Sequence, residues 1–386
     1  MKMSVNLKFL ITSRPYDKIG RGFQTLNIPG LPVIRLKGEG EAEIKKIAEE
    51  IDIYIKDRVS RIQANLHLTE DEERLLLQEL RAIRNQTYLW VYLTLEWIKT
   101  EISNKINETE IRKITSTLPR TVDEAYDKIL AKSKNKGEAK KLLHIIVAAE
   151  RPLTLAEMDL ALALGPNHTS YKDLDYRPDE RISKDIRDLC GLFITITDKK
   201  IYLLHQTAKE FLIWRCAPDR QEYNPDPRGD DSGRNHHDNK LVWKSSLQLS
   251  ESHRLLFQIC IYHLLFTEFE THPLDEFIGG DVSHYLRNHV FLDYSAANWA
   301  THFRASDIEE NEVIELLERI CDVRSRRCLT WFRIYWASTQ TNFPRGFTTI
   351  MIASYFGLEK LVEHQLELDD VEIDTVLSLS SMAIIL

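Results

Sequence analysis

The sequence has no apolar run long enough to cross a membrane. Its longest runs, LLHIIVAA and the C-terminal MAIIL, fall well short of the roughly 20 residues that span a bilayer. The N-terminus is short and polar, and it lacks the apolar core of a secretory signal. We therefore expect a cytoplasmic protein that makes no membrane contact.

Cysteine is scarce as well. The five cysteines are Cys190, Cys216, Cys260, Cys321 and Cys328. An odd and scattered set favours reduced thiols over a disulfide framework. Cys260 with His263, or Cys321 with Cys328, could supply metal ligands, but neither spacing comes with the second pair of a zinc pattern. We expect buried structural cysteines and no metal site.

An excess of positive charge is also lacking. The chain has 51 Lys+Arg against 59 Asp+Glu, a formal charge of -8, so no global field attracts nucleic acid or anionic lipid. One local lysine run consists of Lys132, Lys134, Lys136, Lys140 and Lys141. Such a run is typical of a solvated helix face. Neither nucleic acid nor membrane is an expected partner.

The phosphate-binding loop of nucleoside triphosphatases is missing from the sequence. That loop, G-x-x-x-x-G-K-[ST], uses small residues so that backbone amides wrap the phosphates and a lysine reaches them. None of the 14 glycines is followed by lysine, and no acidic strand end precedes LKFLITSRP to hold magnesium. No recognisable Ser-His-Asp or Cys-His order is present either. We expect that the chain taken alone is not an enzyme.

The N-terminal segment carries an apolar strand pattern. Val5–Thr12 reads as a strand buried on both faces of a parallel sheet, and PVIRL at Pro32–Leu36 is the only further candidate nearby. A helical pattern follows, with one apolar face made of Ile44, Ile47, Ile51, Ile55 and Val59. Thr69 is the predicted N-cap of the next helix. This order indicates a two-strand remnant of an α/β domain followed by a helical lid.

Between residues 121 and 214 the predicted order is three helices, a hairpin and one more helix. This is a winged-helix arrangement. Thr154 and Glu157 match a capping box at the start of one helix. Gly191 follows the predicted helix ISKDIRDLC, where a C′ glycine is expected.

The predicted hairpin consists of LFITIT, a turn at Asp198–Lys200, and IYLL. His205 comes directly after the second strand and leads into QTAKEFLIW, which reads as a helix. Free backbone N–H groups at a helix start can bind an anion, so His205 is a candidate contact residue. A structural histidine that caps the hairpin is the alternative.

Residues 217–240 hold almost no apolar side chains but many Pro, Asp, Gly and Asn, and they are predicted to be a disordered linker. Beyond them, SESHRLLFQICIYHLLF and NEVIELLERICDVRSRRCLTWFRIYW read as helices, with FLDYSAANWATHF between them. These segments predict a third, all-helical region that extends to about residue 340.

The last segment resembles an ankyrin repeat. The matching positions are Gly346, Thr348, Ile350, Ala353, Gly357, Leu361 and Val362. Thr349 and Met351 stand where the TPLH signature has Pro and His. Because one repeat cannot bury its own face, the unit must pack on the preceding helices or be followed by further repeats.

Six segments follow one another along the chain: FLITSRP, NQTYLWVYLTLEWI, LPRTVDEAYDKIL, RPLTLAEMDLAL, CGLFITI and LLHQTAKEFL. In this order they resemble the NACHT proteins abundant in filamentous fungi. These proteins are signal-transduction NTPases, related to intracellular immune receptors, in which ADP holds a closed form and ATP licenses assembly. The resemblance covers residues 5 to about 366. It implies that the chain is the C-terminal part of such a protein, through truncation, gene splitting or an incomplete gene model.

The resemblance also implies two nucleotide-sensing residues. Arg14 matches the arginine that the family places at the terminal phosphate, and ligands meet an α/β sheet at such strand ends. His205 matches the winged-helix histidine at the β-phosphate of ADP, although Gln206 stands where some relatives carry Asp. An ordinary surface arginine and a structural histidine are the alternatives. ADP or ATP and Mg²⁺ would be cofactors of a complete parent protein, and no cofactor is expected in this chain.

The expected fold class is mainly α. The expected domains are a NACHT α/β remnant (1–38), a NACHT helical lid (39–119), a winged helix (120–215), a disordered linker (216–240), a helical domain (241–340) and the start of ankyrin repeats (341–386). The expected function is a non-catalytic regulatory and interaction portion of a NACHT-type protein. Its partners would be proteins bound through the helical and ankyrin surfaces, including further copies of the chain.

Two other functions are compatible with parts of the sequence. One is an ADP/ATP switch that a separate phosphate-binding half completes. The other is a DNA-binding winged helix, whose third helix would read the major groove. That helix, ISKDIRDLC, balances Lys184 and Arg187 against Asp185 and Asp188, so it presents no phosphate-binding face.

Overall fold

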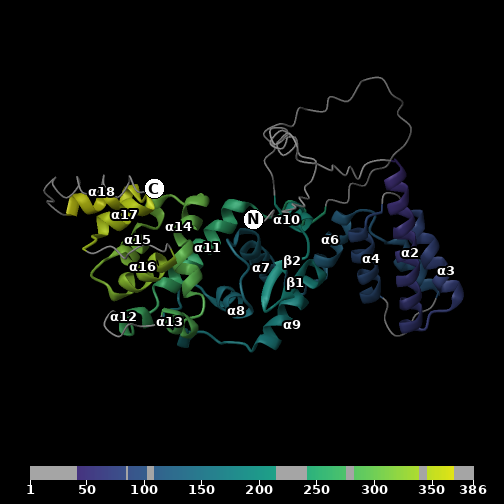
Figure 1. Cartoon of the computed structure of the whole chain (residues 1–386), viewed down its shortest axis with the longest axis horizontal. Helices are drawn as coiled ribbons and strands as arrows, with labels where there is room; N and C mark the ends of the chain where they lie inside the picture. The colour runs from purple at the N-terminus through teal and green to yellow at the C-terminus, as the bar shows by residue number, and fades with distance from the viewer. Residues whose placement is uncertain are drawn as a thin grey trace, which may run out of the picture. The chain divides into compact units, whose positions relative to one another are not determined.

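The computed structural model describes residues 41–83, 86–101, 108–213, 241–274, 282–338 and 346–368. These residues are mainly helical, with a single two-stranded sheet among them, which confirms the predicted fold class (Figure 1). No helix among them is long and apolar enough to cross a membrane. Arg14, the predicted α/β remnant 1–38 and the predicted linker 216–240 lie outside the described residues.

The chain divides into two compact units, Met1–Tyr54 and Ile55–Leu386. The described part of the first unit is the N-terminal part of α2, where Ile51 is buried and Ile47 is 42% exposed. Helix α2 continues into the second unit, and all elements after it lie in that unit.

The region of the predicted lid consists of helices. Their bounds are α2 (Glu41–Leu66), α3 (Glu70–Ala82), α4 (Tyr88–Glu101) and α5 (Glu108–Ser116). Thr69 is the N-cap of α3, as predicted, because its hydroxyl accepts from the backbone N–H of Glu72 while the Glu72 carboxylate accepts from the Thr69 N–H at 2.8 Å. The helices pack in pairs, α3 against α5 and α4 against α6.

The winged-helix region contains one helix more than predicted before its hairpin. Its elements are α6 (Val122–Ala131), α7 (Lys136–Ala148), α8 (Leu155–Ala163), η1 (Tyr171–Asp173), α9 (Asp179–Cys190), η2 (Gly191–Phe193), β1 (Ile194–Thr197), β2 (Lys200–Leu203) and α10 (Gln206–Leu212). The three helices of the winged-helix arrangement are α7, α8 and α9, and α6 precedes them as an additional helix that packs on α4 and α9.

A short extended segment before α8 adds to the hairpin. Leu155 N–H donates to the Lys199 carbonyl at 2.8 Å, and Ile201 N–H donates to the Leu153 carbonyl at 3.0 Å. Thr154, which forms the isolated bridge with Lys200, is also the N-cap of α8 with the predicted capping box to Glu157. The segment therefore occupies the place of the third strand of a winged-helix sheet.

The hairpin turn and the end of α9 both require positive φ angles. Asp198 and Lys199 have φ values of 50° and 60°, which is a two-residue turn that matches the twist of the strands, so Lys200 belongs to β2 and not to the turn. Gly191 has a φ of 54° at the C-cap of α9, a conformation that glycine adopts without steric cost. The structure thus confirms the glycine that was predicted at the C-terminal end of this helix.

The helical region packs on the winged helix through α11. Its elements are α11 (Leu249–Leu264), α12 (Glu268–Thr271), α13 (Val282–Asn288), α14 (Leu292–Ala305), η3 (Glu310–Glu312), α15 (Ile314–Cys321) and α16 (Arg326–Ser338). Helix α11 contacts α7 of the winged helix and α14 of the helical region, and α14 contacts α16 in turn (Figure 1). One hydrophobic core extends from Leu142 and Phe193 to Trp299 and Phe356 without interruption.

The last described helices, α17 (Thr349–Phe356) and α18 (Glu359–Leu368), form a pair that packs on the preceding helices. Thr348 is the N-cap of α17, and Gly357 lies between the helices with a φ of 72°. The pair is bonded to earlier elements, since Leu361 N–H donates to the Glu310 carboxylate at 2.7 Å. These features fit the predicted turn and glycine positions. The ankyrin identity of this pair stays a prediction.

The described cysteines are buried and free, as predicted, and Cys216 lies outside the described residues. Burial raises the pKa of Cys190 to about 12, so its thiol stays protonated and unreactive. Cys260 and His263 do not form a ready pair of metal ligands. Both ring nitrogens of His263 are already hydrogen-bonded, to the Tyr171 hydroxyl (2.6 Å) and to the Ser295 hydroxyl (2.8 Å).

Candidate functional site

A cavity of about 440 Å³ opens beside the predicted nucleotide-sensing histidine. It lies between the C-terminal end of α7, the segment 149–153, β2 and the first turn of α10. Its lining combines apolar side chains with the polar or charged side chains of His205, Gln206, Lys209, Glu150, Arg151 and Tyr202. The structure thus places His205 at a concave surface.

His205 is the N-cap of α10. Its Nδ1 accepts from the backbone N–H of Thr207 at 3.2 Å and lies 2.9 Å from the Thr207 hydroxyl. The Thr207 hydroxyl is held in turn by the Tyr126 hydroxyl at 3.0 Å. The backbone N–H of Thr207 is therefore not free for an anion. Because Nδ1 is an acceptor, the neutral ring carries its proton on Nε2, which remains a hydrogen-bond donor.

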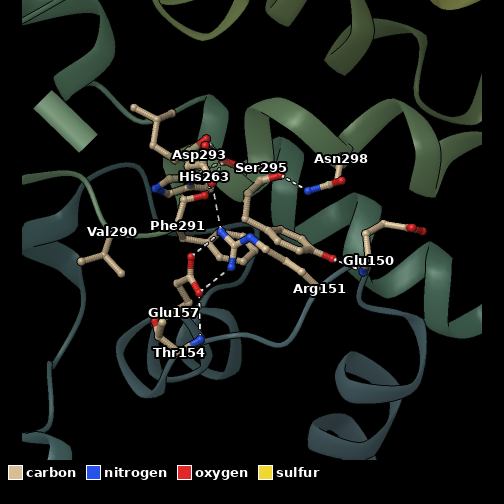
Figure 2. Close-up of polar contacts among 12 residues, drawn as sticks. Glu150, Arg151, Thr154, Glu157, His263, Val290, Phe291, Asp293, Ser295 and Asn298 are labelled. Carbon is tan, nitrogen blue, oxygen red and sulfur yellow. Dashed lines mark hydrogen bonds and ion pairs between the residues drawn. The ribbon is translucent and has the colours of Figure 1, made fainter. Parts of the chain in front are cut away.

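Arg151, which lines this cavity, belongs to a polar cluster that we call the Arg151 clamp (Arg151, Thr154, Glu157, Asp293 and Tyr294). The guanidinium donates two hydrogen bonds to Glu157, at 3.0 and 2.8 Å, and one to Asp293 at 3.1 Å (Figure 2). It also lies over the Tyr294 ring, 5.2 Å from the centroid. The clamp therefore connects the start of α8 with the first turn of α14.

The charges of the Arg151 clamp compensate one another. Burial alone would raise the pKa of Glu157, but the hydrogen bonds from Arg151 and Thr154 outweigh it and hold that pKa below its usual value. Hydrogen bonding to Glu157 raises the pKa of Arg151. Because Arg151 is already matched by two carboxylates, it is a structural cation and not a ligand-binding group of the cavity.

A second polar network joins the winged helix to the helical region around Tyr171. The Tyr171 hydroxyl meets His263 Nε2 and donates to the Val290 carbonyl at 3.1 Å. Ser170 donates to Glu268 at 2.6 Å. Burial lowers the pKa of His263 to about 3 and raises that of Tyr171 far above its usual value, so both stay neutral.

The surface of α9 carries charges of both signs, in agreement with the sequence. Arg177, just before α9, is bonded to Asp159 at 2.7 Å and to Asp185 at 2.8 Å. Lys199 of the hairpin turn pairs with Asp179 at 2.8 Å. These cations are directed to carboxylates of the same domain, which leaves them poorly suited to DNA phosphates.

The lysine run is not simply a solvated face. Lys141 is half-buried, and its ammonium group donates to the Leu162 carbonyl at 2.6 Å at the C-terminal end of α8. Burial lowers the pKa of Lys141. Cations favour the carbonyls at the C-terminal end of a helix, so this lysine stabilises α8. The predicted solvated position is therefore wrong for Lys141. Sequence spacing could not show the burial of this side chain, because its partner Leu162 lies on a different helix.

The comparison with known families agrees with this geometry. Residues 126–220 match the family described as "GPI inositol-deacylase, winged helix domain". This part of the chain is a winged-helix domain. The match begins within α6 and includes α7 to α10.

Two curated fungal proteins are similar to the chain. The vegetative incompatibility protein HET-E-1 of Podospora anserina is 24% identical over 210 residues, which is 54% of this chain and 14% of that protein. The azaphilone pigments biosynthesis cluster protein L of Monascus ruber is 24% identical over 296 residues, 73% of this chain and 58% of that protein. The chain therefore spans less than two thirds of either relative. No solved structure matches it significantly.

Proposed function

We propose that the chain is a non-catalytic regulatory and interaction portion of a NACHT-type signal-transduction protein, in which it scaffolds a nucleotide-controlled switch. The winged-helix match and the similarity to a vegetative incompatibility protein support this assignment. The observation that carries it is the continuous attachment of the winged helix to the helical region through a shared core and the Arg151 clamp.

The attachment argues for transmission of a conformational state between the two regions. If the winged helix moved independently of the helical region, its face toward that region would become exposed to water and would have to be polar. Here α7 is covered by α11, and His144 of α7 bonds to Ser252 of α11 at 2.8 Å. A movement imposed on the winged helix would therefore displace α11 and α14 with it, which is how a rigid element carries a signal.

We expect the purified chain to release no phosphate from MgATP or MgGTP above the level of a heat-denatured sample. Positioning and neutralising the phosphates makes up most of such catalysis, and the chain lacks the glycine-lysine loop that does this. A colorimetric phosphate assay over a range of nucleotide concentrations measures it. Saturable, Mg²⁺-dependent hydrolysis that an Arg14→Ala variant abolishes would contradict the proposal.

An ADP/ATP switch completed by a separate phosphate-binding half is the second candidate function. The position of His205 on the cavity wall favours it, since Nδ1 is used for capping while Nε2 remains a donor. In this hypothesis Nε2 donates to the β-phosphate of ADP, and Arg14 senses the terminal phosphate. Magnesium and nucleotide would then be held mainly by the other half.

Two substitutions at His205 separate the capping role from the phosphate role. Asparagine is a good N-cap, so His205→Asn keeps α10 intact but removes the Nε2 donor, whereas His205→Ala removes both. In a protein that joins this chain to its phosphate-binding half, we expect both variants to bind ADP roughly tenfold more weakly, or worse, as one charge-assisted hydrogen bond is worth about 1.5–3 kcal/mol. Calorimetric ADP titration measures the affinity.

Thermal unfolding provides the control for the His205 pair. Only His205→Ala should lower the melting temperature, because only this variant loses the cap, worth about 1 kcal/mol. If His205→Asn binds ADP like the wild type while His205→Ala is merely less stable, His205 is a structural cap and the second candidate function loses its support.

The proposed partners are proteins, bound through the helical surfaces and through the α17–α18 pair, with further copies of the chain among them. DNA is not favoured, because the cations beside α9 and in the hairpin turn are paired with carboxylates. A cytoplasmic location fits the proposed regulatory role.

A further inference from the structure

Three ligand-type side chains from distant parts of the sequence meet at the junction of the winged helix and the helical region. They are Glu150, two residues after the end of α7, His253 of α11 and His302 of α14. One ligand atom from each lies within 4.8 Å of those from the other two. His302 is fully buried, His253 is buried, and Glu150 is exposed. The cluster is therefore enclosed on the histidine side and open on the carboxylate side.

The two imidazoles direct the same kind of atom at one point. His253 Nδ1 and His302 Nδ1 are 2.9 Å apart. Two nitrogens that bind one tetrahedral Zn²⁺ at its usual bond length are ~3.3 Å apart, so the observed pair needs to widen by only ~0.4 Å.

The far side of His302 has a partner suited to a metal ligand. His302 Nε2 lies 2.8 Å from the Tyr294 hydroxyl, and the same hydroxyl accepts from the Glu150 backbone N–H at 3.2 Å. A histidine that binds metal through one nitrogen commonly donates its other N–H to an oxygen, which fixes the ring orientation. Tyr294 is positioned to accept that N–H.

We propose that Glu150, His253 and His302 form a binding site for a divalent transition metal ion of the zinc class. Two imidazoles and one carboxylate with a position left open to solvent suit Zn²⁺, whereas Mg²⁺ and Ca²⁺ prefer oxygen ligands alone. The adjacent cation Arg151 does not oppose the ion, because Glu157 and Asp293 already neutralise it. The bound ion ties the end of α7 to α11 and α14, the elements through which the winged helix and the helical region are joined.

The competing explanation is a metal-free hydrogen-bonded pair. In that arrangement the Tyr294 hydroxyl donates to His302 Nε2, and His302 Nδ1–H donates to His253 Nδ1. Every contact is then satisfied without an ion, and the cluster has no affinity for zinc. Only a direct measurement of metal binding separates the two arrangements.

The test starts from purified chain stripped of metal with a chelator and then dialysed. Titration with ZnCl₂ in a calorimeter should show one high-affinity ion per chain, and the melting temperature should rise on addition of ZnCl₂, because the ion binds the folded state. Replacement by Co²⁺ should give visible absorption bands typical of mixed nitrogen and oxygen ligands. MgCl₂ should produce none of these effects.

Glu150→Gln is the deciding variant, because its side chain is exposed and the backbone N–H to Tyr294 is kept. It should weaken Zn²⁺ binding at least tenfold, and His302→Gln should abolish it. His144→Gln is the matched control, since His144 is a half-buried histidine bonded to Ser252 outside the cluster, and its zinc affinity should equal that of the wild type. Absence of Zn²⁺ uptake by the stripped wild type, or equal affinity in Glu150→Gln, would overturn the proposal even if His302→Gln does not fold.

Discussion

Arg151→Ala is expected to lower the free energy of unfolding by about 2–4 kcal/mol, the range for removing the hydrogen-bonded partner of a buried carboxylate when that partner is itself partly exposed. The substitution removes both hydrogen bonds to Glu157, the one to Asp293 and the contact with the Tyr294 ring. Glu157, only 8% exposed, would keep its charge with Thr154 as its remaining partner. Urea unfolding followed by tryptophan fluorescence measures the loss.

Asp293→Asn is the control for the clamp. The Asp293 side chain is 56% exposed, so solvent screens its ion pair with Arg151, and the loss should stay below about 1 kcal/mol. An Arg151→Ala protein as stable as the Asp293→Asn protein would show that the bidentate bond to Glu157 contributes little. The attachment of the two regions would then rest on the apolar core and on the polar contacts around Tyr171 and His144.

The pH dependence of the clamp has a definite sign. The pKa of Glu157 is lowered in the folded state, so the carboxylate contributes stability above its unfolded pKa, about 4.3, and loses it as the pH falls through the lower folded value. The stability difference between the wild type and Arg151→Ala should therefore be constant near neutral pH and shrink below about pH 4.

Local signals in the sequence predicted much of the winged helix. Thr154 and Glu157 are three residues apart, so their capping box can be read without knowledge of the fold. Gly191 and the hairpin turn are equally local, because each depends on the φ angles of one or two residues. The residues of α6 carry a helical pattern, but no local feature distinguishes this additional helix from the three helices of the winged-helix arrangement.

The contacts that join the two regions could not be predicted from spacing. Arg151 and Asp293 are 142 residues apart, and His253 and His302 are 49 residues apart on different helices. No periodicity or motif connects such pairs, which meet only because α7 and α14 both pack against α11. The sequence therefore predicted no metal site, whereas the fold assembles three ligand-type side chains.

The aromatic contacts of Phe356 determine whether the α17–α18 pair is part of the same folded body. Phe356 is 4% exposed, and its ring centroid lies 5.0 Å from that of Trp299, 5.7 Å from that of Trp331 and 5.1 Å from that of Tyr335. Trp299 and Trp331 belong to α14 and α16 and are themselves almost fully buried. Phe356 thus connects the last helices to the core that α11 shares with the winged helix.

Phe356→Ala is accordingly expected to cost about 3–5 kcal/mol, the range for a buried Phe→Ala change that leaves a cavity. Hydrogen exchange measured by mass spectrometry should show that the amides of α17 and α18 lose most of their protection, while those of α7 and α11 keep theirs. Tyr355→Phe is the matched control, because it removes only the 3.2 Å contact between the Tyr355 and Tyr335 hydroxyls and should cost less than about 1.5 kcal/mol. Undiminished protection of α17 and α18 in Phe356→Ala would mean that other contacts, such as the hydrogen bond from Leu361 to Glu310, hold the pair in place.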